Sequence, residues 1–376
     1  MVPVPFLAAW RTSCPCVAFF PAAPILAERL TAHKGTPYRD RGTPGSYAGA
    51  MEASGRTAMQ PILTLTVNPA LDVSTATEQV ISGHKLRCGA SRLDAGGGGV
   101  NVSRVVQRLG GRTLAVYTAG GPTGEAYRRL IEAERVPTLA VPIQGSTRED
   151  FTVDETATGK QFRFVLQGPE LSEPEWRLCL ALVADSIPEG GYVVASGSLP
   201  PGVPEDFYAQ VARLARVHDA RCIVDASGPA LSEALAEGVF LVKPSRRELG
   251  LHFGTALESG ESQVEAAAAL VADGSAEHVA LTLGGEGAVL ASANGILRLA
   301  VPQVKVRSTV GAGDSFLAAF VLRLAQGRTL ADALRAAVAA GSATVTTAAT
   351  ELCHREDVER LEAELAAQNL GGSRAL

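Results

Sequence analysis

The stretch "RSTVGAGDSFLAAF" (307–320) places an acidic side chain directly after a turn that is almost bare of side chains. Gly311, Ala312 and Gly313 form the turn, and Asp314 opens an apolar run that is typical of a buried helix. Uncovered backbone N–H groups at a helix N-terminus attract anions. A carboxylate beside such an anion hole can orient an alcohol and accept its proton, as phosphoryl transfer to an alcohol requires. A capping aspartate would not need the glycines, so the pattern favours Asp314 as a general base.

A run of four glycines precedes a second predicted helix, in "DAGGGGVNVSR" (94–104). Such a turn lets the backbone approach a ligand closely. The chain contains no G-K-[ST], so the run is not a Walker loop, and Asn101 stands where a dinucleotide fingerprint would have a glycine. On the glycines alone, a ligand-binding turn and a plain tight turn fit equally well.

Three further turns follow predicted buried strands. "SGSLPPGVP" (196–204) offers the hydroxyl of Ser198, and "LTLGGEGA" (281–288) is rich in glycine. "VKPSRRE" (242–248) combines cations that suit phosphates with Glu248, whose carboxylate suits a hydrated magnesium ion. Each turn alone also fits an ordinary loop. Because the carboxyl ends of parallel strands meet at one edge of a sheet, the turns together predict one site.

Strands and helices alternate along most of the chain. Strands are predicted over 62–68, 113–121, 192–197, 221–227, 239–245 and 278–285, with a hairpin from 287 to 302. Helices are predicted within 96–111 and over 124–135, 204–217, 229–236, 262–273, 314–325, 329–346 and 355–367. This alternation indicates an α/β protein with a mostly parallel sheet covered by helices on both faces.

Two segments, 73–94 and 147–166, interrupt the alternation and carry no helix signal. Both are interpreted as antiparallel strands, the second with a turn at Thr158 and Gly159. They are expected to form a small second sheet together.

Composition and charge narrow the class of protein. Of the 376 residues, 46% are hydrophobic and 19% charged, and the net charge is −5 with no long basic block, so we expect no nucleic-acid partner. The six cysteines show no paired spacing, which favours a reduced, cytoplasmic protein. Residues 1–58 are proline-rich and aperiodic and are interpreted as a disordered leader or a mis-assigned start, and their apolar run "CVAFFPAAPIL" is too short to span a membrane. Residues 369–376 are interpreted as a tail.

The glycine run and the G-A-G-D turn together resemble the two signatures of the ribokinase-like, PfkB-type carbohydrate kinases. The resemblance covers about 59–365, and "TLTVNPALD", "GHKLRC", "SGSLPPGV" and "STVGAGDS" are most similar to the minor, PfkB-type 6-phosphofructokinases of bacteria. It implies a three-layer α/β/α sandwich over 59–368 with a small β-sheet lid from about 73–94 and 147–166. It also implies ATP-dependent phosphorylation of fructose 6-phosphate to fructose 1,6-bisphosphate in glycolysis, and a homodimer that forms through the lid.

The resemblance also assigns roles to residues. Asp314 would be the base and Gly311, Ala312 and Gly313 the anion hole. The sugar phosphate would be bound by Asp72, Gly97, Gly98, Asn101, Arg148 and Ser198, and by Lys85 and Arg87, which can reach the neighbouring subunit's site. ATP would be bound by Lys243, Ser245, Arg247, Thr282, Gly284, Gly287 and Ser342, and Glu248 would hold Mg²⁺ through water.

The chain departs from the family pattern in two places. Ser245 stands where the family usually has asparagine, which is expected to weaken contacts to magnesium or phosphate. Relatives have Asn, Gly and Arg where this chain has Thr347, Ala349 and Glu351, in a segment that helps form a monovalent-cation site. Activation by K⁺ is therefore in doubt.

The sequence also allows functions other than fructose-6-phosphate kinase activity. A 1-phosphofructokinase and a tagatose-6-phosphate kinase share both signatures. A kinase of neutral sugars would not need the cations of Lys85, Arg87 and Arg148. A non-catalytic sugar-phosphate sensor would not need an intact Asp314 and G-A-G turn.

Overall fold

The computed structural model describes residues 59–367 and the backbone of 371–374, all within one structural unit, 55–376. The predicted leader, 1–58, lies outside the described residues, as do 369–370 and 375–376 of the predicted tail. No helix among the described residues is long and apolar enough to cross a membrane. The cysteines in this part, Cys88, Cys179, Cys222 and Cys353, are all free thiols.

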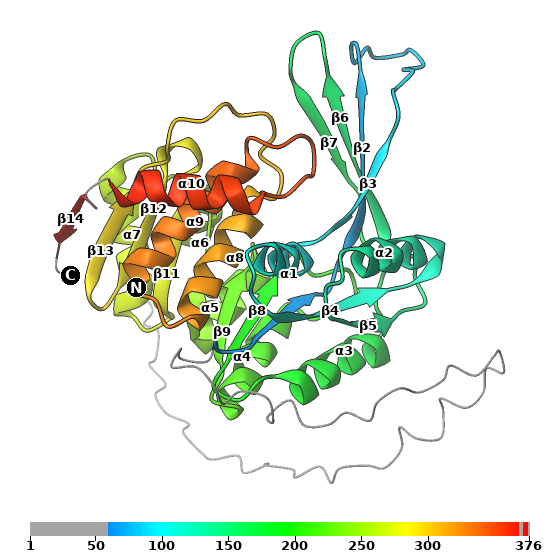
Figure 1. Ribbon diagram of the computed structural model, residues 1–376. Coiled ribbons are helices and arrows are strands. Elements are labelled where there is room, and N and C mark those ends of the chain that lie inside the picture. The colour runs from blue at the N-terminus through cyan, green and yellow to red at the C-terminus, as the bar shows by residue number, and fades with distance from the viewer. Residues whose placement is uncertain (1–58, 368–370, 375–376) are drawn as a thin grey trace, which may run out of the picture. The chain divides into compact units, whose positions relative to one another are not determined.

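The main sheet has ten strands in the order β14-β13-β12-β11-β10-β9-β8-β1-β4-β5 (Figure 1). Their bounds are β1 Ile62–Thr66, β4 Thr113–Ala119, β5 Thr138–Pro142, β8 Tyr192–Ser196, β9 Arg221–Asp225, β10 Val239–Val242, β11 Ala276–Thr282, β12 Ala288–Ser292, β13 Gly295–Leu299 and β14 Gly371–Arg374. From β11 to β5 every neighbouring pair is parallel, and β12, β13 and β14 continue the sheet in antiparallel pairs. The predicted mostly parallel sheet and its hairpin are confirmed.

Helices cover both faces of this sheet. They are α1 Gly98–Arg108, α2 Gly121–Ala133, α3 Glu173–Ser186, α4 Phe207–Val217, α5 Pro229–Glu237, α6 Arg246–Phe253, α7 Gly260–Ala272, α8 Ala312–Ala325, α9 Leu330–Thr344 and α10 Arg355–Ala366. One core joins the sheet to α3, α4, α5 and α7, and a second joins the opposite face to α1, α8, α9 and α10. Alternate residues of one strand supply both, as Val193 and Val194 of β8 do. These three layers confirm the predicted sandwich.

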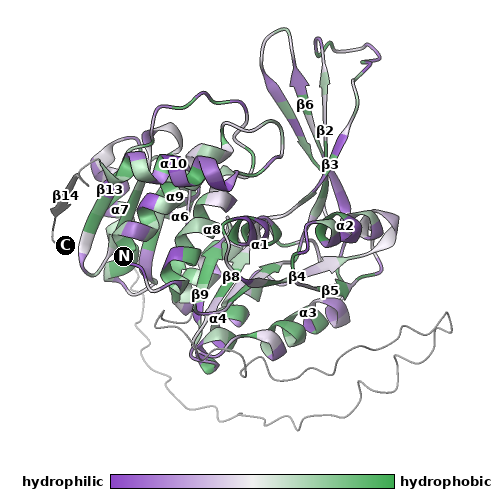
Figure 2. Cartoon of the chain, in the orientation of Figure 1, coloured by the Kyte–Doolittle hydropathy of each residue, from purple (hydrophilic) through white to green (hydrophobic). Residues whose placement is uncertain are grey.

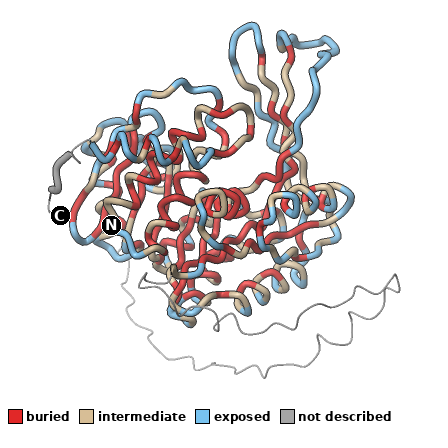
Figure 3. The backbone as a smooth tube through the Cα atoms, viewed as in Figure 1, coloured by how far each residue is buried: buried red, intermediate tan, exposed pale blue. Residues whose placement is uncertain are grey.

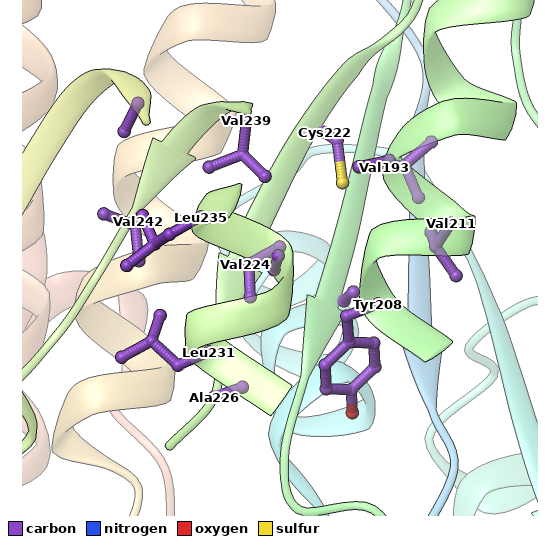
Figure 4. Close-up of a cluster of buried hydrophobic side chains, with 14 of the residues drawn as sticks. Val193, Tyr208, Val211, Cys222, Val224, Ala226, Leu231, Leu235, Val239 and Val242 are labelled. Carbon is purple, nitrogen blue, oxygen red and sulfur yellow. The ribbon is translucent and has the colours of Figure 1, made fainter. Parts of the chain in front are cut away.

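The first core shows why apolar strands end up in the middle. Figure 4 shows Val193, Cys222, Val224 and Val242 from three strands packed against Tyr208 of α4 and neighbouring aliphatic side chains. Figure 2 shows the same pattern along the chain, with hydrophobic strands inside and polar residues on the outer helix faces. A strand buried on both faces has no polar side to present, so its sequence reads as a continuous apolar run.

The second sheet, which we call the lid sheet, has the order β3-β2-β6-β7. Its strands are β2 Ala70–Thr77, β3 Arg92–Gly96, β6 Arg148–Glu155 and β7 Gln161–Val165. The outer pairs are antiparallel as predicted, but β2 and β6 pair in parallel, so the expectation of antiparallel strands is wrong for the central pair. The reason is topological: β2 follows β1 and β6 follows β5, so both leave the main sheet in the same direction. The far ends of the lid sheet are largely exposed (Figure 3).

Of the strands and α-helices that the structure describes, β5, β14, α3 and α6 were not predicted from the sequence. The segment 242–248 was interpreted as a charged loop, whereas α6 begins within it at Arg246. Both missed helices begin with a capping box, Ser172 with Glu175 in α3 and Ser245 with Glu248 in α6. The S-x-x-E spacing was therefore the available signal.

Candidate active site

The turn before α8 brings the two glycine-rich motifs together. The helix begins at Ala312 after Gly311, whose φ of 74° lies in the left-handed region that favours glycine. Asp314 lies in the first turn of α8, partly buried, and its Oδ2 accepts a hydrogen bond of 2.9 Å from Asn101 Nδ2 in α1. The two residues are 213 positions apart in the chain. The fold therefore joins the N-terminal ends of α1 and α8 at one point.

Some backbone donors of this turn remain available. Within the described residues, no acceptor is found for the N–H groups of Gly311 and Gly313. The N–H of Ala312 makes a long bond of 3.4 Å to Thr309 O, and that of Val310 donates to Ser308 Oγ at 3.3 Å. The predicted anion hole therefore offers two uncommitted donors at the positive end of α8.

A buried ion pair lies beside the turn. Lys243 Nζ is 3.0 Å from Asp225 Oδ1, and a Cβ on Gly313 would stand 3.4 Å from the same Nζ. Burial lowers the pKa of Lys243, but the carboxylates of Asp225, Asp314 and Glu248 outweigh that effect and raise it overall. The ammonium therefore stays charged next to the anion hole. Asp225 was missed in the sequence, although it ends a predicted strand at the correct edge of the sheet.

The carboxyl of Asp314 titrates far above its ordinary range. Burial and the nearby negative charge of Asp225 raise its pKa to about 6, against opposing effects from the Asn101 hydrogen bond, Lys243 and Arg163. A general base works best when its pKa lies near the operating pH, because it is then both deprotonated and basic enough to accept a proton. Asp314 has the geometry and the basicity for that task.

A cavity of about 220 Å³ gathers predicted residues from four segments. Gly98, Ser198, Glu248 and Asp314 line it together with Asp225 and residues of the adjoining turns. A second cavity, of about 640 Å³, is lined by Arg148 and again by Ser198, as well as by Asn68. Asn68 Nδ2 donates to Ser198 Oγ at 3.0 Å. Ser198 thus borders both hollows.

The glycine run serves packing and access at once. A Cβ on Gly98 would stand 2.1 Å from Ser196 Oγ, and one on Gly99 would stand 2.4 Å from Leu65 O. Gly97 has a φ of 122°, where other residues are strained. The run is therefore a tight turn that the packing requires; Gly98 also borders the cavity that contains Asp314, and ligand binding by this turn stays a prediction.

Asp72 lies in a row of carboxylates across the lid sheet. The strand register places it between Asp94 on β3 and Asp150 on β6, and a Cβ on Gly96 would stand 2.3 Å from Asp72 Oδ2. Burial, followed by the charge of Asp150, raises the pKa of Asp72 to about 7. A sugar hydroxyl could share its proton with such a carboxyl.

Two arginines of the lid sheet face this row, and they differ in their partners. Arg148 is ion-paired with Asp150 at 3.2 Å and donates to the carbonyl oxygens of Leu166 and Asn68, while its Nε is buried without a partner. Arg163 of β7 is exposed, and no ion pair is found for it in the part of the chain that the structure describes. Its charge lowers the pKa of Asp72, Asp150 and Asp314. Arg163 was missed in the sequence, and strand alternation after Gln161 was the only signal for it.

Lys85 and Arg87 lie elsewhere. Both are exposed in the connection between β2 and β3, at the end of the lid sheet that points away from the main sheet (Figure 1). The structure does not bring them to the Asp314 cavity.

The predicted nucleotide residues cluster around the ends of β10 and β11. Ser245 and Thr282 form a parallel backbone bridge, and Thr282 Oγ1 also donates to Pro244 O. Gly284 is exposed with a φ of 59° and open space beside it. Gly287 has a structural need to be glycine, because a Cβ there would stand 2.0 Å from Leu299 O.

Two other predicted nucleotide residues behave differently. Ser342 Oγ in α9 is buried without a hydrogen-bond partner, which leaves it able to bind a ligand atom. Arg247 lines a separate cavity of about 590 Å³ between α6 and the loop that follows it, together with Leu251 and Leu257. Arg247 therefore does not face Asp314 in this structure.

The residues present fit a hydrated magnesium ion. Magnesium prefers oxygen ligands and keeps several waters. Asp225, Glu248 and Asp314 line the same cavity, although no group of three His, Cys, Asp or Glu side chains within the described residues is close enough to hold a metal directly. Ser245 donates to Glu248 Oε2 through both its N–H and its hydroxyl, each at 2.8 Å. The serine thus orients the carboxylate predicted to hold the metal through water.

The segment after α9 is closed by its own hydroxyls. Ala349 has a φ of 52°. Ser308 Oγ donates to Ala349 O at 2.6 Å, and Thr347 Oγ1 donates to the carbonyl oxygens of Thr344 and Glu351. A monovalent cation would compete with these hydrogen bonds for the carbonyl oxygens.

Comparison with known protein families identifies the class. The model of the pfkB family carbohydrate kinases matches residues 67–357 of this chain. The chain therefore belongs to the pfkB carbohydrate kinase family.

Individual relatives are consistent with this assignment. The ATP-dependent 6-phosphofructokinase isozyme 2 of Mycobacterium tuberculosis is 44% identical, over 82% of this chain and 90% of its own length. The crystal structure of phosphofructokinase-2 from Escherichia coli in complex with fructose-6-phosphate has a TM-score of 0.78 and 40% identity, and the alignment covers 82% of this chain and 100% of that one. A 1-phosphofructokinase of Bacillus subtilis is 34% identical, over 81% and 98%. The predicted ribokinase-like α/β fold and kinase class are confirmed.

We expect Asp314→Asn to raise the free energy of unfolding at neutral pH. The folded-state pKa of about 6 exceeds the ordinary 3.8. Between these values the folded protein holds a proton that the unfolded chain releases, so stability falls as the pH rises. Asparagine does not titrate, so the variant does not lose stability in this way as the pH rises. The gain should be about 1–2 kcal/mol above roughly pH 6.5, allowing for partial solvent access, and should vanish near about pH 4.

Chemical denaturation of both proteins across this pH range measures the difference. Glu286→Gln, at an exposed residue in the turn after β11, serves as the control for the loss of one negative charge. A variant no more stable than the parent at about pH 7.5 would contradict the raised pKa.

Proposed function

We propose that the protein transfers the γ-phosphoryl group of ATP to fructose 6-phosphate and forms fructose 1,6-bisphosphate. The observation that carries the proposal is the partly buried carboxyl of Asp314, with its pKa of about 6, beside free N–H donors and the ammonium of Lys243. That arrangement suits proton transfer from an alcohol together with charge stabilisation on a phosphoryl group. The relatives' identities of 40–44% favour fructose 6-phosphate over the substrate of the 34% identical 1-phosphofructokinase.

In the proposed mechanism the sugar hydroxyl that receives the phosphoryl group hydrogen-bonds to Asp314. The oxygen attacks the γ-phosphorus, its proton passes to the Asp314 carboxylate, and the bond to the bridging oxygen of ADP breaks. The N–H groups of Gly311 and Gly313 and the Lys243 ammonium stabilise the negative charge on the phosphoryl oxygens. Asp72 holds another hydroxyl of the sugar from the lid sheet.

The phosphate already present on the substrate needs a cation, and Arg163 is proposed as the main one. Residues two apart on a strand share a face, so the register Thr152 with Arg163 places Arg163 on the same face as Asp150 and Asp72. Among the described residues no carboxylate is ion-paired with its guanidinium, so a phosphate would not have to displace one there. Arg148 is proposed as a second contact, although a phosphate there must compete with Asp150.

The nucleotide is proposed to lie along the ends of β10 and β11, with Ser245, Thr282, Gly284 and Ser342 around it. Mg²⁺, bound through water by Glu248, would neutralise charge on the phosphates. A cytoplasmic location is also proposed, and the free thiols in the described residues support it.

ATP turnover with a panel of sugars tests the substrate. Fructose 6-phosphate is expected to give the highest kcat/KM, ahead of fructose 1-phosphate, tagatose 6-phosphate and fructose. No turnover with any member, despite binding, would favour the sugar-phosphate sensor. Because the carbonyl oxygens around residues 344–351 already accept hydrogen bonds, added KCl is expected to change the rate little.

Asp314→Asn is expected to lower kcat by about 10²–10⁴-fold, the usual contribution of a general base. The KM for ATP should stay close to that of the parent. Steady-state kinetics of the folded variant provide the measurement. Turnover within a few-fold of the parent would remove Asp314 from the mechanism.

Arg163→Ala is expected to raise the KM for fructose 6-phosphate about tenfold to a hundredfold. This follows from roughly 1.5–3 kcal/mol for hydrogen bonds to a charged group, at 1.4 kcal/mol per tenfold. Arg148→Ala should raise it less and should also lower the melting temperature, because it leaves Asp150 unpaired.

Unphosphorylated fructose is the matched control substrate for both arginine variants. Its weaker turnover should change little in Arg163→Ala, because it has no phosphate. Equal losses with both sugars would show that Arg163 shapes the lid sheet and does not bind the phosphate.

The lid sheet is proposed to form a homodimer. On the face opposite Asp72, the register aligns Leu93, Val73, Phe151 and Phe164 in one row across all four strands. Leu93 and Phe164 are 44% and 52% exposed. A second copy of the same face would cover this apolar row, and a dimer would let Lys85 and Arg87 reach the neighbouring site.

Phe164→Glu is expected to convert dimers into monomers, because it puts a charge into that row at its most exposed side chain, on the edge strand β7. Sedimentation velocity measures the change, and turnover should fall with it. The control is Val217→Glu on α4, where the parent side chain is 80% exposed and lies outside the lid sheet. An unchanged sedimentation coefficient in Phe164→Glu would exclude this face as the interface.

A further inference from the structure

Arg104 of α1 is a charged side chain that the proposed mechanism does not use, and it is only 2% exposed. Its Nε donates to Glu134 Oε1 at 2.8 Å, and one terminal nitrogen donates to Ala95 O at 2.7 Å. Burying a guanidinium costs free energy that surface pairing would avoid. The groups that Arg104 binds therefore indicate what the buried guanidinium does in the structure.

The same terminal nitrogen of Arg104 also donates to Asn101 Oδ1 at 3.1 Å. Asn101 in turn donates from Nδ2 to Asp314 Oδ2 at 2.9 Å. A guanidinium has hydrogen-bond donors only, so it can donate to the carbonyl oxygen of the amide but cannot form a hydrogen bond with the NH₂ group. With its oxygen bound to Arg104, the amide must present its NH₂ to Asp314.

We propose that Arg104 is a positioning residue that sets the orientation of the Asn101 amide and thereby keeps a hydrogen-bond donor on the carboxylate of Asp314. The inference deepens the proposed function, on which it rests. Arg104 also joins this chain of contacts to the lid sheet, because Ala95 lies in β3 and Asp94 Oδ1 is 3.8 Å from the guanidinium. The orientation of the base is therefore coupled to the strand that carries the lid sheet.

The consequence of losing Arg104 follows from the amide. A freed amide can rotate and place its oxygen against the Asp314 carboxylate, which disfavours the charged form of Asp314. The other charged groups around Asp314 are Asp225 at the end of β9, Lys243 after β10, Arg163 of β7, and Glu248 of α6, which lines the same cavity. None of them can replace the lost donor from α1, since Lys243 is already paired with Asp225 at 3.0 Å.

Arg104→Lys is the sharpest variant, because it keeps the positive charge and removes the planar fork. Retaining the charge matters because Arg104 also lowers the pKa of Asp72. The acidic limb of the pH profile of kcat/KM for fructose 6-phosphate is expected to move up by about one pH unit, the size expected for a hydrogen bond to a charged group. At about pH 6, kcat/KM should fall roughly fivefold to tenfold, while the KM for ATP stays the same.

A double-mutant cycle separates positioning from a general loss of stability. In an Asn101→Ala background the amide is absent, so adding Arg104→Lys should not move the acidic limb further. A shift of the same size in both backgrounds would show that Arg104 acts through its field on Asp72 and would overturn the proposal.

Arg108→Lys is the matched control. Arg108 lies one turn later on α1 and pairs with the same Glu134 at 3.2 Å. Its hydrogen bonds within the described residues do not include one to Asn101. It should lower the melting temperature without moving the acidic limb. If Arg104→Lys also lowers only the melting temperature, its role is structural and the proposal fails.

A readout without turnover keeps this test independent of the proposed reaction. The difference in unfolding free energy between a protein and its Asp314→Asn partner depends on pH through the pKa of Asp314. In the Arg104→Lys background the midpoint of that dependence should move up by about one pH unit. This shift is expected even if no sugar phosphate is turned over, and an unmoved midpoint would contradict the positioning role.

Discussion

The structure depends on the close meeting of two helix N-termini at the carboxyl edge of the sheet. The hydrogen bond from Asn101 to Asp314 closes that junction across 213 residues of sequence. It forms only because side chains are missing where the backbones approach: Gly98 against Ser196, Gly99 against Leu65 O and Gly311 against Leu352. A methyl group added at Gly98 or Gly99 would push the start of α1 away from β8 or β1, and one added at Gly311 would push the turn before α8 away from Leu352. The glycines that look like sites of flexibility in the sequence are thus the most rigid requirement of the fold.

Several carboxylates lie at or near this junction, and only some of them are paired with a cation. Asp225 has a buried ammonium within 3.0 Å, and Asp150 has the guanidinium of Arg148 at 3.2 Å. Asp72 and Asp314 have no cation in such contact in the described part of the chain, and burial raises their pKa values to about 7 and 6. The two carboxyls left without a close cation are those that the proposed mechanism assigns to sugar hydroxyls. Their unfavourable environment is the source of their basicity.

The sequence predicted those parts of the molecule that repeat a local pattern. Apolar runs between turn signals gave the parallel strands, and the G-A-G-D turn gave Asp314, because both depend on neighbouring residues. Contacts between segments that lie far apart in the sequence were harder to predict. The parallel pairing of β2 with β6 follows from where each strand leaves the main sheet, which no window of sequence contains. Asp225 and Arg163 were missed for the same reason, since only the folded structure brings their charges close enough to act on the pKa of Asp314. Arg148 was predicted to bind the sugar phosphate, and the structure pairs it with Asp150.

The lid sheet shows how one topological choice can serve binding and positioning together. Because β2 and β6 both continue outward from strands of the main sheet, the first residues of each stay near its carboxyl edge while their far ends extend away (Figure 1). Asp72 and Arg148 therefore belong to the fixed base of the lid sheet, and Lys85 and Arg87 to its free end. The strand β3 returns from that end to the glycine run, and Arg104 holds it there through Ala95 O. The contacts of Arg104 thus join the base of the lid sheet, through Ala95, to Asn101, whose amide faces Asp314.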